Sequence, residues 1–282
     1  MAIIKSVNVG NTMNIQSGGR PVHGGYTRPS AVLSGSFPNK PVNFVNTREI
    51  NFSQGVPSGT IGSQRAIVGS DQWYIIYDAN YSGSSSATKV TDATANGSPS
   101  DVWKMQWVAG DFWPIPDGGH GIGNIFTNIT ALNISHLYTS VHFKFSAGYP
   151  WHNISNKWLW WTPNQLLQQS NEGGVWMRGA VLDAVGGGQW LSPGLENGAT
   201  LNTYVNTPIT DGVWHQIESL IDRSSGTWKT WYDGTLILDA SGVTFDDPYF
   251  EEFLLEAFRG GGGETLPSDC ENYWDHIHLA WA

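Results

Sequence analysis

Residues 212–239 read GVWHQIESLIDRSSGTWKTWYDGTLILD, and this stretch decides the fold class. In a β-strand, successive side chains point to opposite faces of the sheet. Ile217 and Ile221 then share one apolar face, whereas Gln216 and Glu218 share the other face. The alternation predicts a strand with one side in a core and one side carrying polar groups.

An Asp-Gly pair, Asp233 and Gly234, lies within the second half of the same stretch. Asp-Gly favours the two-residue turns in which both central residues take positive φ, and these turns join antiparallel strands. The sequence therefore predicts a tight hairpin after the first strand.

The same alternation recurs along most of the chain. It predicts strands within residues 72–79, 101–110, 137–148, 157–163, 175–184, 212–222, 227–239, 250–258 and 273–281. Clusters of Gly, Ser, Asn and Pro separate these segments, as is typical of all-β proteins. We therefore expect an all-β, antiparallel sandwich over residues 66–282.

Residues 1–65 differ from the rest, because they are rich in Asn, Ser, Gly and Pro and their apolar residues stand singly. We expect an extended arm with little core of its own. Phe37, Phe44, Val45 and Phe52 suggest that the arm docks along the sandwich or onto other subunits. The second alternative predicts a homo-oligomer or a larger assembly held together through the arm.

Composition excludes several classes of protein. The 282 residues include only 14 Lys and Arg against 24 Asp and Glu, a net charge of −10, which argues against nucleic acid as a partner. No apolar stretch approaches the ~18 residues of a membrane-spanning helix, so no membrane insertion is expected. The only cysteine, Cys270, excludes an intrachain disulfide. The first residues lack the apolar core of a signal peptide, which predicts synthesis in the cytoplasm.

Three stretches together resemble the concanavalin A-like lectin/glucanase superfamily, especially its polysaccharide-lyase-like branch. They are residues 212–239, with Trp214, Glu218, Trp231, Asp233 and Gly234, the strand of residues 137–148 with Lys144, and residues 260–281 with Asp275. The resemblance covers roughly residues 100–282. It implies a jelly roll of two curved sheets, with a glycan groove on one concave face.

Alternation in separate strands yields ten residues that we expect to line this concave face. Indole rings stack on the apolar faces of sugar rings, and fixed polar groups bind the hydroxyls. In NKWLWWT (156–162), Trp161 is then assigned to the core. The predicted glycan-binding residues are His142, Lys144, Trp158, Trp160, Trp176, Arg178, Gln216, Glu218, His276 and His278.

Alternative roles stay open for several of them. Glu218 also suits a structural carboxylate, and His276 and His278, two residues apart, more often flank a strand than bind a metal. Asp275 resembles the position at which related domains hold a structural calcium ion, although no cofactor is required. We therefore predict Asp275 as the metal ligand if a metal is bound.

Two functions compete. Missing hydrolase signatures, such as a Glu-x-Asp-x-x-Glu run, favour a non-enzymatic carbohydrate-binding protein or a surface or virion structural protein that acts outside the cell. The alternative is a polysaccharide lyase that acts by β-elimination on a uronate-containing glycan. His142, Lys144, Arg178 and Gln216 supply parts of such a site, but alternation places no Tyr beside a partner base.

Overall fold

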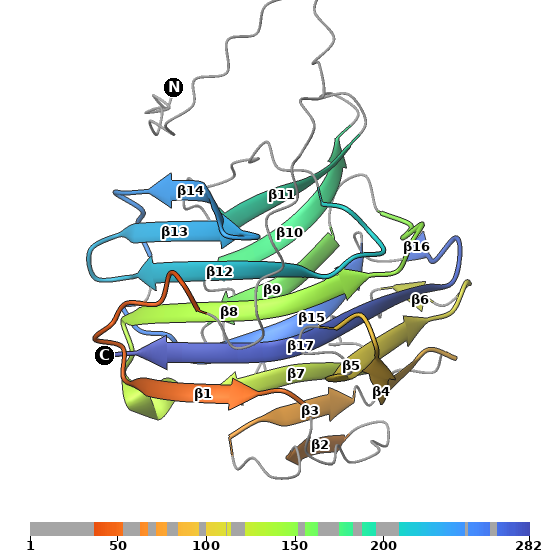
Figure 1. Cartoon of the computed structure of the whole chain (residues 1–282), viewed down its shortest axis with the longest axis horizontal. Helices are drawn as coiled ribbons and strands as arrows, with labels where there is room; N and C mark the ends of the chain where they lie inside the picture. Colours follow the sequence, from red (N-terminus) through yellow and green to blue (C-terminus); the bar gives the residue numbers. More distant parts are fainter. Residues whose placement is uncertain are drawn as a thin grey trace, which may run out of the picture.

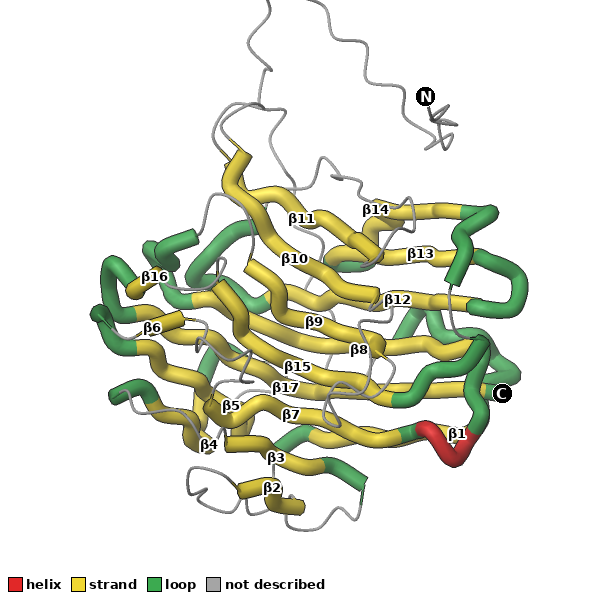
Figure 2. The backbone as a smooth tube through the Cα atoms, turned by 180° about the vertical axis from the view of Figure 1, so that it is seen from behind, coloured by secondary structure: helices red, strands yellow, loops and turns green. Residues whose placement is uncertain are grey.

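A computed structural model of the chain shows two antiparallel β-sheets packed face to face, one in front of the other in Figure 1 and seen from behind in Figure 2. The predicted all-β, antiparallel sandwich is confirmed. The described residues contain no α-helix, only the 3₁₀ turn η1 (Thr130–Leu132), and no helix able to span a membrane. The structure describes residues 37–52, 63–66, 72–77, 84–95, 100–110, 112–113, 122–151, 156–162, 175–182, 188–195, 209–245, 248–259 and 264–282.

The first sheet has eight strands, and its centre is formed by three of the strands that alternation predicted. β1 is paired with β17 beside the main strand order. The strands, in spatial order, are β14 (Thr235–Ala240), β13 (Thr227–Tyr232), β12 (His215–Asp222), β8 (His136–Phe145), β17 (Cys270–Trp281), β5 (Ser100–Trp107) and β4 (Ser86–Asp92), with β1 (Asn46–Ile50).

The second sheet has seven strands and lies behind the first. In spatial order these are β11 (Gly188–Leu195), β10 (Val175–Leu182), β9 (Asn156–Thr162), β15 (Glu252–Arg259), β7 (Ile122–Asn128), β3 (Tyr74–Tyr77) and β2 (Ser63–Ala66). A separate two-stranded sheet pairs β16 (Glu264–Thr265) with β6 (Phe112–Trp113).

The core lies between the two large sheets, and it follows the predicted alternation. Val141 and Phe143 of β8 and Ile217 of β12 are buried there against Phe253 and Leu255 of β15. Each such side chain contributes about 1.5–3 kcal/mol by leaving water. The remaining face of β8, β12 and β17 is the outer face of the eight-stranded sheet.

The hairpin between β13 and β14 forms at the predicted Asp-Gly pair. Asp233 has φ of 47° and Gly234 has φ of 77°, as a turn with two left-handed residues requires. The Asp233 carboxylate also accepts hydrogen bonds from the Gln216 backbone (2.8 Å) and from the His215 ring (2.7 Å). This residue therefore ties the turn to the neighbouring strand.

Strict alternation fails in β17. It would place Trp274 with His276 and Asp275 with Ile277, but Trp274 and Ile277 are both in the core. The register of β17 against β8 shifts between Asp275 and His278, so a β-bulge exchanges the faces. The predicted assignment of side chains to the two faces of this strand is correct after the bulge and wrong before it.

Part of the predicted arm belongs to the sandwich. β1 pairs with the last residues of β17, and the preceding segment, residues 37–45, crosses the outer face of the eight-stranded sheet (Figure 1). Phe44 and Phe52 are fully buried, whereas Val45 is exposed. Along residues 37–52 the arm therefore docks on the chain's own sheet.

Candidate functional site

The candidate site lies at the centre of the eight-stranded sheet, on the outer face. His142 of β8 is in register with Gln216 of β12 on one side and with Asp275 of β17 on the other. Two residues farther along β8, Lys144 is in register with Tyr273. Opposed residues on neighbouring strands share a face. Three strands therefore place polar groups on one surface, and those of β8 and β17 are ionisable.

The bulge in β17 brings Asp275 and His276 to the same surface. His276 has φ of 45°, in the left-handed region that a residue with a Cβ rarely adopts. Its Nδ1 lies 2.7 Å from Oδ2 of Asp275, and its backbone N–H donates to Oδ1 at 2.8 Å. Ser100 Oγ donates to Oδ2 from β5 at 3.0 Å. The carboxylate thus fixes a strained histidine, as is common at functional sites.

The electrostatics of this pair follow from its burial. Burial lowers the pKa of His276, but the hydrogen bond and the charge of Asp275, together with Glu49, outweigh it and raise the pKa above its usual value. Burial also raises the pKa of Asp275, and the bonds from His276 and Ser100 only partly offset it. Asp275 therefore makes the His276 imidazole a stronger base than an isolated one.

His142 is a buried neutral imidazole beside this pair. Burial, followed by the charge of His276, lowers the pKa of His142 to about 4. The two rings contact edge to face, with centroids 5.7 Å apart. Within the described part of the structure, neither ring nitrogen has a well-aligned hydrogen-bond partner, although the His276 backbone lies close enough to act on the pKa of the ring. An unpaired buried polar group costs free energy, which makes His142 a candidate to bind a ligand.

Lys144 forms the cationic part of the site. Its ammonium group is paired with the Asp92 carboxylate and lies 4.5 Å from the ring centre of Tyr273 and 5.2 Å from that of Trp214. Burial raises the pKa of Asp92, but the hydrogen bonds from Lys144 and Thr94 outweigh it and the pKa is lowered. The carboxylate therefore stays ionised beside the ammonium group.

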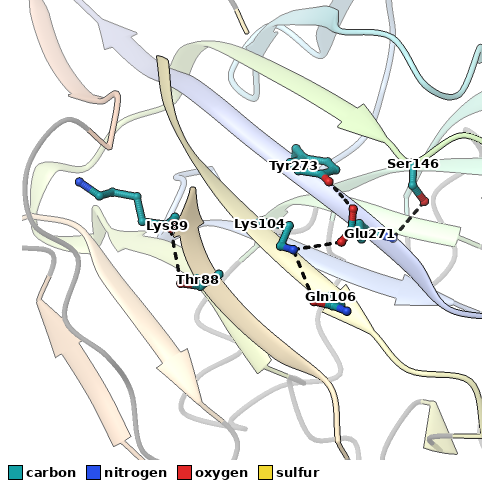
Figure 3. A network of polar contacts seen from close by, with 7 residues as sticks. All are labelled: Thr88, Lys89, Lys104, Gln106, Ser146, Glu271 and Tyr273. Carbon is teal, nitrogen blue, oxygen red and sulfur yellow. Dashed lines mark hydrogen bonds and ion pairs between the residues drawn. The ribbon is translucent and has the colours of Figure 1, made fainter. Parts of the chain in front are cut away.

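A second chain of polar contacts continues from Tyr273 across β17 to β5. The Tyr273 hydroxyl donates to the Glu271 carboxylate, which also accepts from Lys104 Nζ at 3.0 Å (Figure 3). Lys104 in turn lies 3.4 Å from Gln106 Oε1. Burial and Glu271 raise the pKa of Tyr273, so its hydroxyl keeps its proton at neutral pH. Tyr273 therefore carries a proton, which it can give to a substrate only by releasing Glu271.

Glu218 and His278 lie on the same face but are covered by residues 37–45. Asn39 Nδ2 donates to Glu218 Oε2 at 2.8 Å, and the Tyr138 hydroxyl donates to Oε1. Phe37 stacks on His278 with ring centroids 3.8 Å apart. Both predicted glycan-binding residues are buried, and Glu218 has the contacts of the structural carboxylate that the sequence left open.

The tryptophans that were expected on this face belong to the other sheet. Trp158 and Trp160 are in β9, and Trp176 and Arg178 are in β10, whereas β8, β12 and β17 form the eight-stranded sheet. The ten residues therefore do not share one face of one sheet, which corrects that expectation. In the register of β9 with β15, Trp160 is opposite Leu254 and Trp161 is opposite Phe253. Their side chains lie outside the described part of the structure.

The metal role of Asp275 stays a prediction. Both of its oxygens accept hydrogen bonds or ion-pair contacts from Ser100 and His276. Among the described residues, no cluster of three or more His, Cys, Asp or Glu side chains has a geometry that could hold a metal ion.

Sequence reasoning missed Tyr273 and Trp214 as site residues. The resemblance marked Trp214 only as part of a strand pattern, and no tyrosine was assigned beside a base. A positive-φ bulge reverses the phase of Tyr273, and nothing in the local alternation indicates a bulge. The usable signal was the pairing of Lys144 with the strand that ends the chain, because this pairing places Tyr273 opposite it.

The sequence matches no model of a protein family and no curated protein. Among solved structures, a variant of the alginate lyase Aly36B in complex with alginate trisaccharide is 15% identical, with 83% of this chain and 97% of that chain covered and a TM-score of 0.51. A structure reported with endo-acting O-glycanases of the human gut microbiota is 12% identical, with 85% and 99% covered and a TM-score of 0.48. Alginate lyase vAL-1 from Chlorella virus is 12% identical, with 70% and 92% covered and a TM-score of 0.42.

Identities this low bear on the fold alone. The chain has a concanavalin A-like jelly-roll sandwich, as the resemblance implied. Function has to be argued from the site itself.

Proposed function

We propose that the chain binds a uronate-containing polysaccharide on the outer face of the eight-stranded sheet and cleaves it by β-elimination. The observation that carries the proposal is the strained His276–Asp275 pair. Asp275 is two residues along β17 from Tyr273, which is opposite Lys144 on the same face. This reverses the order in which the sequence ranked the two functions, and the support for the change is that Tyr273 is in register with Lys144.

The reaction needs three groups. A base removes the proton on the carbon next to the uronate carboxylate, a cation stabilises the negative charge that develops there, and an acid protonates the departing glycosidic oxygen as the new carbon–carbon double bond forms. We assign these tasks to His276 held by Asp275, to Lys144, and to Tyr273, whose raised pKa keeps the hydroxyl protonated.

Two further residues fit substrate binding. His142 is neutral and 2% exposed, so its ring nitrogens would bind the uronate carboxylate or a hydroxyl only after the groups that cover them move aside. Trp214, half-buried beside Lys144, offers an aromatic surface to a sugar ring.

Substrate choice is supported less directly. The alginate lyase of similar fold was solved with an alginate oligosaccharide, and that finding belongs to that protein. The net charge of −10 opposes a strongly anionic polymer, and Lys144 and Lys104 on this face are paired with Asp92 and Glu271. We favour a glycan in which uronates are the charged sugars, because a uronate carboxylate can replace Asp92 as the partner of Lys144.

The test is an absorbance assay for unsaturated products with a panel of polyuronates. The wild-type chain should release them, and His276→Ala and Tyr273→Phe should each lower kcat/KM by about 10²–10⁴-fold, as removal of a general acid or base does. His136→Gln, on the same strand as His142 but away from the site, is the control. Glycan binding with no unsaturated product from any substrate would instead support the non-enzymatic carbohydrate-binding protein.

Assembly through residues 1–65 and a place on a virion or cell surface stay predictions. The described parts of that segment, residues 37–52 and 63–65, contact or join the chain's own sheets, so these predictions gain no support from them.

A further inference from the structure

Residues 37–45 form a raised strap across one end of the outer face. The strap runs over β12, β8 and β17 before the chain enters β1 (Figure 1). Phe44 packs against Tyr138, Ala280 and the half-buried Leu220. The strap is thus in contact with all three central strands that build the candidate site.

The strap is fastened by polar as well as apolar contacts. The Asn39 side chain donates to Oε2 of the buried Glu218, and its backbone N–H lies 3.4 Å from Oε1. Phe37 covers the His278 ring at 3.8 Å, with an angle of 15° between the planes. Lys40 Nζ donates to the Phe44 carbonyl at 2.9 Å and closes the strap on itself.

The strap ends close to the candidate site. On the outer face of β8, Tyr138, Ser140, His142 and Lys144 follow one another in order. The strap contacts Tyr138, and the site begins at His142, four residues farther along the strand. At about 3.3 Å per residue, the two are only ~13 Å apart.

We propose that this strap is the end wall of the glycan-binding face, so that Phe37 and Asn39 limit how far a polysaccharide extends beyond His142 toward Tyr138. The inference rests on the proposed function, because it assigns a length limit to that same site. A glycan that runs along the strands meets the strap, and the part beyond it cannot contact Tyr138, Glu218 or His278.

The test measures affinity and product length with uronate oligosaccharides of increasing size. In the wild-type chain, affinity should stop rising once the oligosaccharide reaches the strap. Phe37→Ala opens the surface over His278 and leaves the Asn39–Glu218 bonds in place, so longer oligosaccharides should gain about threefold to tenfold in affinity, as one added ring contact gives. Longer products should also accumulate.

Val42→Ala is the matched control, because Val42 is in the same strap and 97% exposed, and it should change neither readout. Phe37→Ala/Asn39→Ala opens more of the face, and its melting curve shows whether the sandwich stays folded. If that variant unfolds, Phe37→Ala alone decides the question.

The outcomes are distinguishable. If the wild-type chain binds or cleaves polyuronates and Phe37→Ala shows the same dependence on oligosaccharide length, the end wall is overturned and the proposed function stands. A wild-type chain that neither binds nor cleaves any polyuronate would overturn the proposed function, and the end wall with it.

Discussion

Replacing His142 with phenylalanine should remove the part of the acid-induced loss of stability that protonation of His142 causes. Burial lowers the pKa of His142 from 6.5 to about 4. The unfolded chain then takes up a proton as pH falls below 6.5, while the folded chain does so only near pH 4. Stability is therefore fully present above pH 6.5 and is lost as pH falls toward 4.

The size of the effect follows from the shift. One pKa unit corresponds to about 1.36 kcal/mol, so the contribution of His142 to the free energy of unfolding should fall by about 2 kcal/mol between pH 7 and pH 5. Below pH 4 the loss should level off at about 3 kcal/mol. Phenylalanine keeps an aromatic ring against His276 and has no nitrogen to titrate or leave unpaired.

The assay is urea unfolding followed by tryptophan fluorescence at pH 5, 6 and 7, with the free energy taken from the linear extrapolation. The wild-type chain should lose about 2 kcal/mol more than His142→Phe over this range. His136→Gln is the control and should retain the loss, because His142 is unchanged. If the wild-type chain and His142→Phe lose the same amount, folding does not lower the pKa of His142, and its assignment as a buried neutral group is wrong.

Three further outcomes are expected. Glu252 of β15 is fully buried with no hydrogen-bond partner among the described residues, and burial and Glu251 raise its pKa to about 8. Its folded pKa exceeds the unfolded 4.5, so stability falls as pH rises from 4.5 to 8; Glu252→Gln should abolish a loss of about 3 kcal/mol at pH 7, measured by the same urea series. Gly226→Ala should lower the free energy of unfolding, measured by thermal unfolding, by at least about 1 kcal/mol more than Gly242→Ala. Both glycines have positive φ, but only a Cβ at position 226 would lie 2.5 Å from the Val243 carbonyl oxygen. Equal losses in the two variants would contradict this clash. Since the Asp275 oxygens are occupied by protein donors, adding calcium or a chelator should shift Tm by less than about 1 °C, whereas a calcium-dependent rise would support the metal role of Asp275.

Local alternation was a good guide wherever a strand has one buried face and an unbroken register. In β8 and β12 it placed Val141, Phe143 and Ile217 in the core and Gln216 outside it. The Asp233–Gly234 turn was equally local, because positive φ at two successive positions is a property of those residues. A one-residue slip in register would move every buried apolar side chain of the strand to the solvent face. Each residue of the strand therefore indicates independently which side chains face the core.

The candidate site was only partly predictable. His142, Lys144, Gln216 and His276 were found because they alternate with core residues on the three central strands. Tyr273 and Asp275 were misplaced because the bulge at His276 adds a residue to β17. The cost of that strained residue is offset by its contacts with the neighbouring Asp275 carboxylate and with the His142 ring of β8.

The sequence by itself therefore determined the all-β class, most of the strands and the polar character of one face, since these depend on a period of two residues and on turn chemistry. Only the tertiary structure decided that β9 and β10, with Trp158, Trp160, Trp176 and Arg178, join the sheet opposite β8, β12 and β17. It also decided that Phe37 and Asn39 cover His278 and Glu218. Sheet membership and docking depend on contacts between residues far apart in the chain, and the pattern within one strand does not indicate which strands lie beside it.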